Sequence, residues 1–211
     1  MLTLYDYVPS GNCYKVRLLL TQLGIPFRRK ETDIIAGATR TAGFLGKFPN
    51  GRVPAVELED GRLLFESNAI LWYFADGTRL LPRDNFDRAQ VLQWMFFEQY
   101  SHEPNIACRR FLLMYPQLAD ERRALMDRML RAGEQALSVL ERHLASNEFL
   151  AAGRYTIADI ALYAYTHVAH QGGFQLSNFP AVEAWLDRVR LQPGHIAIDD
   201  AGAGLDMMGK P

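Results

Sequence analysis

The chain has 211 residues, nearly half of them hydrophobic, and its 23 basic residues almost cancel its 24 acidic ones. This length suits two closely packed domains. The balanced charge argues against nucleic acid or an anionic membrane surface as a partner. No apolar run approaches the ~18 residues that span a bilayer, and the N-terminus lacks the basic and apolar regions of a signal peptide.

Two cysteines, Cys13 and Cys108, are too few for a disulfide framework, and no Cys/His cluster has the spacing of a zinc site. We therefore expect a cytoplasmic protein without a bound metal. The absence of a Cys-x-x-Cys motif disfavours a dithiol oxidoreductase. Cys13 is expected to be buried on a helix rather than reactive.

The first third of the chain alternates between strand and helix patterns. A short strand around Leu2 and Leu4 is followed by an apolar helical stripe that ends at Gly24 and comprises Val16, Leu19, Leu20 and Leu23. Residues 27–34 are rich in charge and are expected to form an edge strand. This order predicts a small β-α-β unit.

A hairpin and a helix complete this first domain. Asp60-Gly61 separates two strand-like runs at 54–59 and 62–65, which predicts a hairpin with a type I′ turn. Ser67 is expected to cap a helix over residues 69–75. The α/β domain therefore ends near residue 76, and residues 77–86 have the composition of a linker.

Residues 87–211 are helical in pattern. Amphipathic stretches cover residues 87–115, 119–144, 156–170 and 181–191, and the tail after residue 201 is expected to be loose. Thr156 and Asp159 form a capping-box variant. The aromatic cluster Trp94, Phe96, Phe97 and Tyr100 is expected to be chiefly core, with one or two members lining an apolar pocket.

Three short segments could carry chemistry, and each has an ordinary structural alternative. Ser10 precedes a helix, where its hydroxyl either donates to an anion or caps the turn. Pro54 is either a trans turn residue or a cis proline that exposes the Val53 main chain to an added peptide strand. Glu66 and Ser67 fit a zwitterionic amino-acid head at a helix start, or Ser67 only caps its helix.

His102 and Glu103 are a further candidate pair in the helical part. They would touch a substrate if they lined a cleft, but side chains in such positions more often make helix-surface or interface contacts. The other histidines of the chain suggest no shared site.

The order of these weak signals resembles the cytosolic glutathione transferases over nearly the whole chain. The resemblance is closest to bacterial, theta-like members that use an N-terminal serine, and Asn12 departs from their common pattern. It is carried by the segments Ser10-Gly-Asn-Cys13, Gly51-Arg-Val-Pro54, Phe65-Glu-Ser67, Thr156-Ile-Ala-Asp159, Gln171-Gly-Gly-Phe174 and Ala184-Trp-Leu-Asp-Arg188.

The resemblance implies a thioredoxin-like α/β domain at 1–76, a linker at 77–86 and an all-α helical bundle at 87–211 that forms the electrophile pocket. Glutathione is the implied co-substrate, and a homodimer is the usual assembly. Val53, before a cis Pro54, matches the residue that pairs with the cysteinyl unit. The other implied glutathione-binding residues are Glu66 and Ser67 at the γ-glutamyl head, and Arg52 and Arg40 near the glycyl carboxylate.

Ser10 aligns with the serine that activates the thiol, and Asn12 is positioned to share or take over that hydrogen bond. Tyr5 and Tyr7 lie nearby, but Tyr5 is on the expected strand, so neither displaces Ser10. The expected reaction is attack of the glutathione thiolate on a small apolar electrophile, as in detoxification. The alternatives are a non-catalytic glutathione-binding or interaction protein, and a glutathione-dependent peroxidase, dehalogenase or isomerase.

Overall fold

The computed structural model describes residues 1–118, 124–200 and 205–206. The chain divides into two compact units, which are described separately. The first comprises Met1–Asp76 together with the segment from Pro193 onward, and the second comprises Gly77–Gln192. We expected residues 87–211 to form one helical domain, and the assignment is wrong for the segment after Gln192, which belongs to the first unit.

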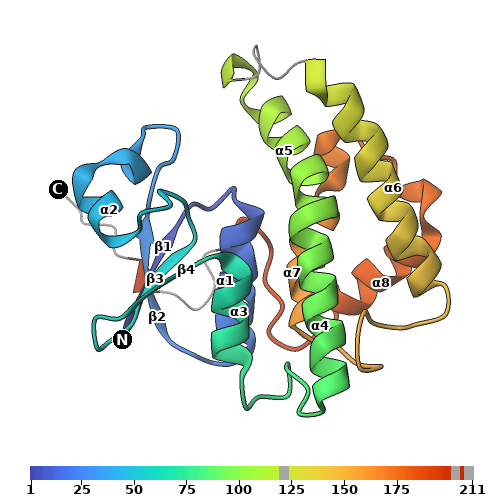
Figure 1. Cartoon of the computed structure of the whole chain (residues 1–211), viewed down its shortest axis with the longest axis horizontal. Coiled ribbons are helices and arrows are strands. Elements are labelled where there is room, and N and C mark those ends of the chain that lie inside the picture. Colours follow the sequence, from blue (N-terminus) through green and yellow to red (C-terminus); the bar gives the residue numbers. More distant parts are fainter. Residues whose placement is uncertain (119–123, 201–204, 207–211) are drawn as a thin grey trace. The chain divides into compact units, whose positions relative to one another are not determined.

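A mixed five-stranded sheet forms the centre of the first unit (Figure 1). β1 pairs in parallel with β2 and antiparallel with β3, which in turn pairs antiparallel with β4. The strand order is β4-β3-β1-β2-β5, with bounds Ala55–Glu57 for β3, Leu63–Phe65 for β4, Leu2–Asp6 for β1, Phe27–Glu31 for β2 and Leu205–Asp206 for β5.

Successive side chains of β1 point to opposite faces of this sheet, so each face has its own core. Leu4 lies in a cluster with residues of α1 (Gly11–Gln22) and α3 (Ser67–Ala75). Tyr5 lies in a second cluster with Phe44 of α2 (Ala42–Lys47). The sheet therefore holds α1 and α3 on one face and α2 on the other.

Two local expectations for the sheet are wrong. β2 is not an edge strand, because β5 pairs with it in parallel. That pairing is contributed by residues nearly 180 positions further along the chain, beyond the reach of a local charge pattern. The hairpin between β3 and β4 does form, but within it only Gly61 has a positive φ, of 83°. Its turn is therefore a type I turn followed by a glycine bulge, and not type I′.

The second unit is built from five α-helices and shorter helical turns within the described residues. α4 passes through a π-helical turn, Glu98–His102, into α5, and α7 is buried along its whole length. The bounds are Asn85–Phe97 for α4, Glu103–Met114 for α5, Met126–Leu144 for α6, Ile157–Thr166 for α7 and Pro180–Arg190 for α8. The predicted fold class, an α/β domain followed by a helical bundle, is confirmed.

Thr156 caps α7 as predicted. Its hydroxyl accepts from the main-chain N–H of Ala158 in the first turn at 3.3 Å, and the Asp159 carboxylate accepts from the Thr156 main-chain N–H at 2.9 Å, so the capping box is complete. Part of the predicted stretch 119–144, and most of the tail after residue 201, lies outside the described residues.

Candidate functional site

Ser10 occupies the N-cap of α1. Its backbone is extended, and its Oγ accepts a hydrogen bond from the Cys13 main-chain N–H at 3.3 Å. Because Oγ is the acceptor in this bond, the hydroxyl hydrogen is left to donate elsewhere, and none of the described residues accepts it. The capping role and the donor role predicted for Ser10 are therefore compatible.

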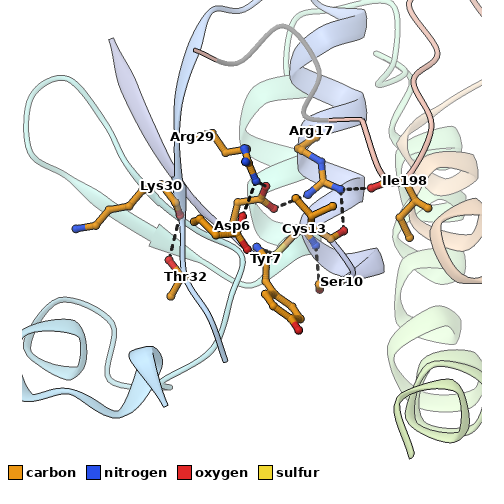
Figure 2. A network of polar contacts seen from close by, with 11 residues as sticks. Asp6, Tyr7, Ser10, Cys13, Arg17, Arg29, Lys30, Thr32 and Ile198 are labelled. Atoms are coloured by element: carbon orange, nitrogen blue, oxygen red, sulfur yellow. Dashed lines mark hydrogen bonds and ion pairs between the residues drawn. The ribbon is translucent and has the colours of Figure 1, made fainter. Parts of the chain in front are cut away.

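A buried ion-pair network lies beneath the loop that carries Ser10 (Figure 2). Arg17 of α1 donates to the Asp6 carboxylate at 2.5 Å and to the main-chain oxygens of Val8 at 3.1 Å and Ile198 at 2.6 Å. Arg29 of β2 also donates to Asp6, at 3.2 Å. Arg17 thus holds both the Ser10 loop and the C-terminal segment of the first unit.

Cys13 is fully buried, as expected, and does not present a reactive thiol. Its sulfur accepts a hydrogen bond from the Tyr7 main-chain N–H at 3.3 Å. Burial raises the pKa of the Cys13 thiol well above its ordinary value, and the nearby Asp6 carboxylate acts in the same direction. The Cys13 thiol therefore stays protonated at neutral pH and serves the packing of α1.

Tyr5 is engaged on the opposite face of the sheet from α1. Its hydroxyl donates to Oε2 of Glu57 at 2.8 Å and accepts from Nζ of Lys47 at 3.4 Å. Burial and the hydrogen bond to Glu57 raise the pKa of Tyr5. The Tyr5 hydroxyl is therefore already engaged, so Tyr5 does not displace Ser10 as the candidate hydrogen-bond donor to a ligand.

Asn12 and Ser67 meet directly, which joins the start of α1 to the start of α3. The Ser67 hydroxyl donates to Oδ1 of Asn12 at 3.3 Å, and Nζ of Lys15 donates to the Ser67 hydroxyl at 3.4 Å. The expectation that Ser67 caps α3 is wrong. The N-cap is Glu66, Ser67 is the first helical residue, and its side chain points sideways into this contact.

Glu66 is held in an uncommon backbone conformation at the start of α3. Its φ is 71°, and it makes no side-chain capping bond, so the first-turn N–H groups of α3 are not capped by a side chain. One carboxylate oxygen of Glu66 accepts from Nδ2 of Asn50 at 2.7 Å, while the side chain stays exposed. An exposed carboxylate beside open helix N–H groups can bind the ammonium and carboxylate of one amino-acid head.

Val53 precedes a cis Pro54, which decides between the two alternatives left open above. The Val53 side chain packs against the cluster around Tyr5, and no described residue hydrogen-bonds to its main chain. A residue placed in this way can pair with an extended peptide through its N–H and C=O groups.

The two arginines are exposed, and Arg40 has a defined neighbour. Gly51 has a φ of 61°, and a Cβ on it would lie 2.6 Å from Nη1 of Arg40. Gly51 lies two residues before Val53, and its missing side chain makes room for the Arg40 guanidinium. Arg52 is exposed in the same loop.

All eight candidate residues lie in the first unit. The structure brings Asn12 into contact with Ser67 and places Arg40 against the Gly51 loop, whereas no hydrogen bond or ion pair among the described residues joins the Arg52 side chain to the others. Lys15 and Asn50, which contact Ser67 and Glu66, were missed by sequence reasoning. Lys15 could have been found because it is a charged residue among apolar residues of a helix, three positions after Asn12.

The second unit contains a pocket of about 280 Å³ whose lining includes Phe97, Tyr100 and Asn105. The expectation of an aromatic core is right for buried Trp94 and wrong for Phe96, which is 69% exposed. Two other members of the cluster, Phe97 and Tyr100, line this pocket, as the second part of the expectation predicted. His102 is buried, with Nε2 2.9 Å from Oγ1 of Thr166, so it is an internal residue.

Neither a metal centre nor a membrane-spanning element is found in the described part of the chain. Its His, Cys, Asp and Glu side chains form no group of three or more that could hold a metal ion. Its helices are all too short or too polar to cross a bilayer.

Two family models match the chain. The glutathione S-transferase N-terminal domain covers residues 1–76, and the glutathione S-transferase C-terminal domain covers residues 95–193. The chain therefore belongs to the glutathione S-transferase family. The predicted co-substrate, glutathione, is confirmed at the level of this family.

Individual relatives agree with this assignment. The crystal structure of a glutathione S-transferase from Pseudomonas fluorescens is 50% identical, with a TM-score of 0.91 over 94% of this chain and 99% of that chain. Ure2p in complex with glutathione is 25% identical, with a TM-score of 0.83 over 92% and 95%. The disulfide-bond oxidoreductase YfcG of Escherichia coli (strain K12) is 30% identical over 92% of each chain.

Proposed function

We propose that this chain is a theta-like glutathione transferase that binds glutathione in its first unit and adds the glutathione thiolate to a small apolar electrophile. The observation that carries the proposal is the contact between Asn12 and Ser67. It holds the start of α1, with the candidate hydrogen-bond donors Ser10 and Asn12, against the start of α3, where the γ-glutamyl head would bind. One tripeptide that spans the two helix ends would use both.

The geometry of each residue supports a separate role in binding glutathione. The first-turn N–H groups of α3 take the γ-glutamyl carboxylate, and Glu66 takes its ammonium group. The Val53 main chain, next to cis Pro54, pairs with the cysteinyl unit. Arg40 and Arg52 supply positive charge for the glycyl carboxylate.

The chemical role of Ser10 and Asn12 is to favour the ionised thiol. A thiol with a pKa of about 8.5 is only roughly 3% ionised at pH 7. A shift of about two pKa units requires roughly 2.7 kcal/mol. One hydrogen bond to a charged acceptor, ~1.5–3 kcal/mol, and a helix-dipole contribution of ~0.3–1 kcal/mol are of that size. No separate base is therefore needed.

The transfer itself makes a carbon–sulfur bond. With 1-chloro-2,4-dinitrobenzene, the thiolate sulfur attacks the ring carbon, the carbon–chlorine bond breaks, and chloride leaves with the electron pair. The thiol proton has already gone to solvent. The aromatic side chains that line the pocket of the second unit, half-buried Phe97 and exposed Tyr100, suit an apolar electrophile.

Binding and ionisation of glutathione test this proposal. Calorimetry should detect binding at millimolar glutathione, and thiolate absorbance should show ionisation of the bound thiol well below its pKa in solution. Ser10→Ala and Asn12→Ala should each raise that pKa, and the larger rise identifies the main donor. Absence of glutathione binding by folded protein would overturn the proposal.

A second candidate reaction is the glutathione-dependent reduction of a disulfide. It is favoured by the similarity to the oxidoreductase YfcG over nearly the whole of both chains. Here the thiolate would attack a disulfide sulfur, and the other sulfur would leave as a thiolate. Product analysis with 2-hydroxyethyl disulfide beside 1-chloro-2,4-dinitrobenzene distinguishes the two reactions, and binding without either product would indicate the non-catalytic alternative.

We also propose a cytoplasmic homodimer. Neither Cys13 nor Cys108 forms a disulfide, which suits a reducing compartment. Large apolar side chains are exposed on each unit, among them Phe65 on the first and Phe86, Phe96 and Tyr100 on the second. Burial of such side chains against a second copy would stabilise a dimer. Sedimentation at micromolar concentration tests the assembly, and a monomer there would contradict it.

A further inference from the structure

A pocket of about 450 Å³ lies in the first unit, on the face of the sheet that α2 covers. This volume is within the range of ~300–1,000 Å³ that is typical of small-molecule sites. Its wall comes from the end of β1, the end of β2 and the segment that forms α2. The side chains in this wall that bear on a ligand are Tyr5, Lys30, Thr32, Thr41, Phe44 and Lys47.

This pocket is separate from the candidate glutathione site. None of the eight candidate glutathione and thiol residues lines it. Lys30 is in register with Tyr5, so the two side chains share the α2 face of the sheet. Figure 2 shows the Lys30 side chain directed away from α1, whereas Arg29 of the same strand turns to Asp6. The contact between the starts of α1 and α3 belongs to that other face.

The carboxylates around the pocket already have cationic partners. Glu57 accepts from the Tyr5 hydroxyl at 2.8 Å and from Nζ of Lys47 at 2.7 Å. Glu31 accepts from Arg29 at 2.5 Å. Lys47 therefore offsets the charge of Glu57, and Arg29 offsets the charge of Glu31.

The two threonine hydroxyls in the wall are engaged within the protein as well. Thr32 donates to the main-chain oxygen of Lys30 at 3.1 Å (Figure 2). Thr41 donates to the main-chain oxygen of Ala38 at 3.2 Å and accepts from the Phe44 main-chain N–H at 3.3 Å. Each hydroxyl hydrogen is thus used, and neither threonine is left to donate to a ligand.

The remaining hydrogen-bond donors belong to the two lysines. Among the described residues, the Lys30 ammonium group has no hydrogen-bond acceptor, and its Nζ lies 5.0 Å from the centroid of the Tyr5 ring. Nζ of Lys47 lies 6.0 Å from the same centroid, and one of its three N–H groups remains after the bonds to Glu57 and Tyr5. Because Lys47 is already offset by Glu57, Lys30 gives the pocket an excess positive charge that suits an anion.

The aromatic part of the wall suits a flat apolar body. The rings of Tyr5 and Phe44 meet edge to face, with their centroids 5.8 Å apart, and both side chains are largely buried. Burial holds the two rings in place, so a planar ligand can pack against them without ordering them first.

We propose that this pocket is a second ligand site, which binds a small aromatic carboxylate. The carboxylate accepts from Lys30 and from the third N–H group of Lys47, and the ring of the ligand packs against Tyr5 and Phe44. The site goes beyond the proposed function, because it requires neither glutathione nor the thiol donors.

Calorimetry with 2-naphthoate tests this site. The titration is made with S-hexylglutathione at saturation, so that the glutathione site is filled. 2-Naphthoate should bind at one site with a dissociation constant below about 1 mM. The neutral analogue 2-naphthalenemethanol should bind at least about tenfold more weakly, because it lacks the charge that pairs with the lysines. Added salt should weaken the binding of 2-naphthoate and leave that of the alcohol unaltered.

Variants of Lys30 locate the ligand. Lys30 is exposed, so its replacement does not disturb the core. Lys30→Met keeps the length of the side chain and should weaken 2-naphthoate binding about tenfold, and Lys30→Glu should weaken it further. Arg28→Met is the matched control. Arg28 is an exposed cation on the same strand and the same face of the sheet but does not line the pocket, so this variant should bind 2-naphthoate like wild type.

Three results would overturn the inference. Absence of 2-naphthoate binding at millimolar concentration would remove the site. Equal affinity for 2-naphthoate and the alcohol would show that no ammonium group recognises the ligand. Wild-type affinity for 2-naphthoate in Lys30→Met would place the ligand elsewhere. Failure of the wild-type chain to bind S-hexylglutathione would instead count against the proposed function, and 2-naphthoate would then be titrated alone, so the two failures are distinguishable.

Discussion

The indole Nε1 of Trp185 donates a 3.0 Å hydrogen bond to Oδ1 of Asp159, which ties α8 to the first turn of α7. The same carboxylate accepts from the main-chain N–H groups of Leu150 at 3.0 Å and Thr156 at 2.9 Å. Asp159 is fully buried, so one side chain of the capping box joins three segments of the second unit.

Asp159→Asn should destabilise the protein. The variant replaces Oδ2 with an N–H donor that faces the Thr156 main-chain N–H, and this leaves a buried donor without an acceptor. Such a loss costs ~1–3 kcal/mol of unfolding free energy. Urea denaturation followed by circular dichroism measures the loss. Thr156→Ser, which keeps the capping hydroxyl, serves as the control and should stay close to wild type.

The difference in unfolding free energy between wild type and Asp159→Asn should depend on pH. Burial raises the pKa of Asp159 from its ordinary 3.8 to about 6, although its hydrogen bonds oppose the shift. The folded chain therefore holds this proton more tightly than the unfolded chain. As pH rises from about 4 to about 6, the unfolded chain ionises first, and the contribution of Asp159 to stability falls.

Asparagine does not titrate, so the stability difference between wild type and Asp159→Asn should widen as pH is lowered from about 6 towards about 4. Other groups titrate in both proteins and cancel in the difference. Unfolding curves at several pH values in this window provide the measurement. A difference that stays constant across the window would mean that Asp159 does not take up a proton there.

Arg17→Met should cost considerably more than the loss of a surface ion pair. It leaves the buried Asp6 carboxylate with the longer contact to Arg29 and removes the donors to Val8 and Ile198. Breaking one side of a buried pair typically costs ~3–5 kcal/mol. Arg190→Met breaks an exposed pair with Asp187 and is the matched control, with an expected cost below about 1 kcal/mol. Equal losses in the two variants would contradict the role assigned to Arg17.

The sequence predicted the fold well where the pattern is local, and less well where distant residues meet. The apolar stripe of α1, the hairpin between β3 and β4 and the Thr156 capping box all depend on neighbouring residues, and all three form. The edge assignment for β2 failed because β5 comes from the other end of the chain.

In the candidate site, too, features set by neighbouring residues were predicted and features set by distant residues were not. A serine at a helix start predicts a cap, and Ser10 is one. Ser67 has the same local signal but is used otherwise, because Asn12 and Lys15, more than fifty residues earlier, supply partners for its hydroxyl. Asp6, Lys15 and Arg17 were not predicted to be buried. Their charges are offset by contacts between elements, which a pattern along one element does not reveal.

Two glycines should respond in opposite ways to alanine. A Cβ on Gly133 of α6 would lie 2.6 Å from Cζ of buried Phe174 and 3.2 Å from Ile106, so Gly133→Ala overpacks the second unit and should cost ~1–3 kcal/mol. Gly46 of α2 has open space at its Cβ and an ordinary negative φ, so Gly46→Ala should stabilise the protein by about 0.5 kcal/mol. Thermal unfolding of both variants provides the comparison, and destabilisation by Gly46→Ala would contradict it.

The two thiols should differ sharply in reactivity. Cys13 is fully buried with a raised pKa, whereas Cys108 is partly exposed. Because the thiolate is the reactive form, a thiol-specific disulfide reagent should modify Cys108 first and Cys13 only as fast as the first unit opens. Titration of the released chromophore should therefore show two phases, and Cys108→Ser should abolish the faster one.

The same difference tests whether a thiol of the protein itself takes part in the reaction. If glutathione supplies the only reacting thiol, Cys108→Ser should retain activity and no mixed disulfide should form at Cys13 during turnover. Mass spectrometry of the protein after incubation with oxidised glutathione tests this directly. A glutathione adduct on Cys13 in folded protein would show that the buried thiol is accessible, and would move the chemistry from the co-substrate to the chain itself.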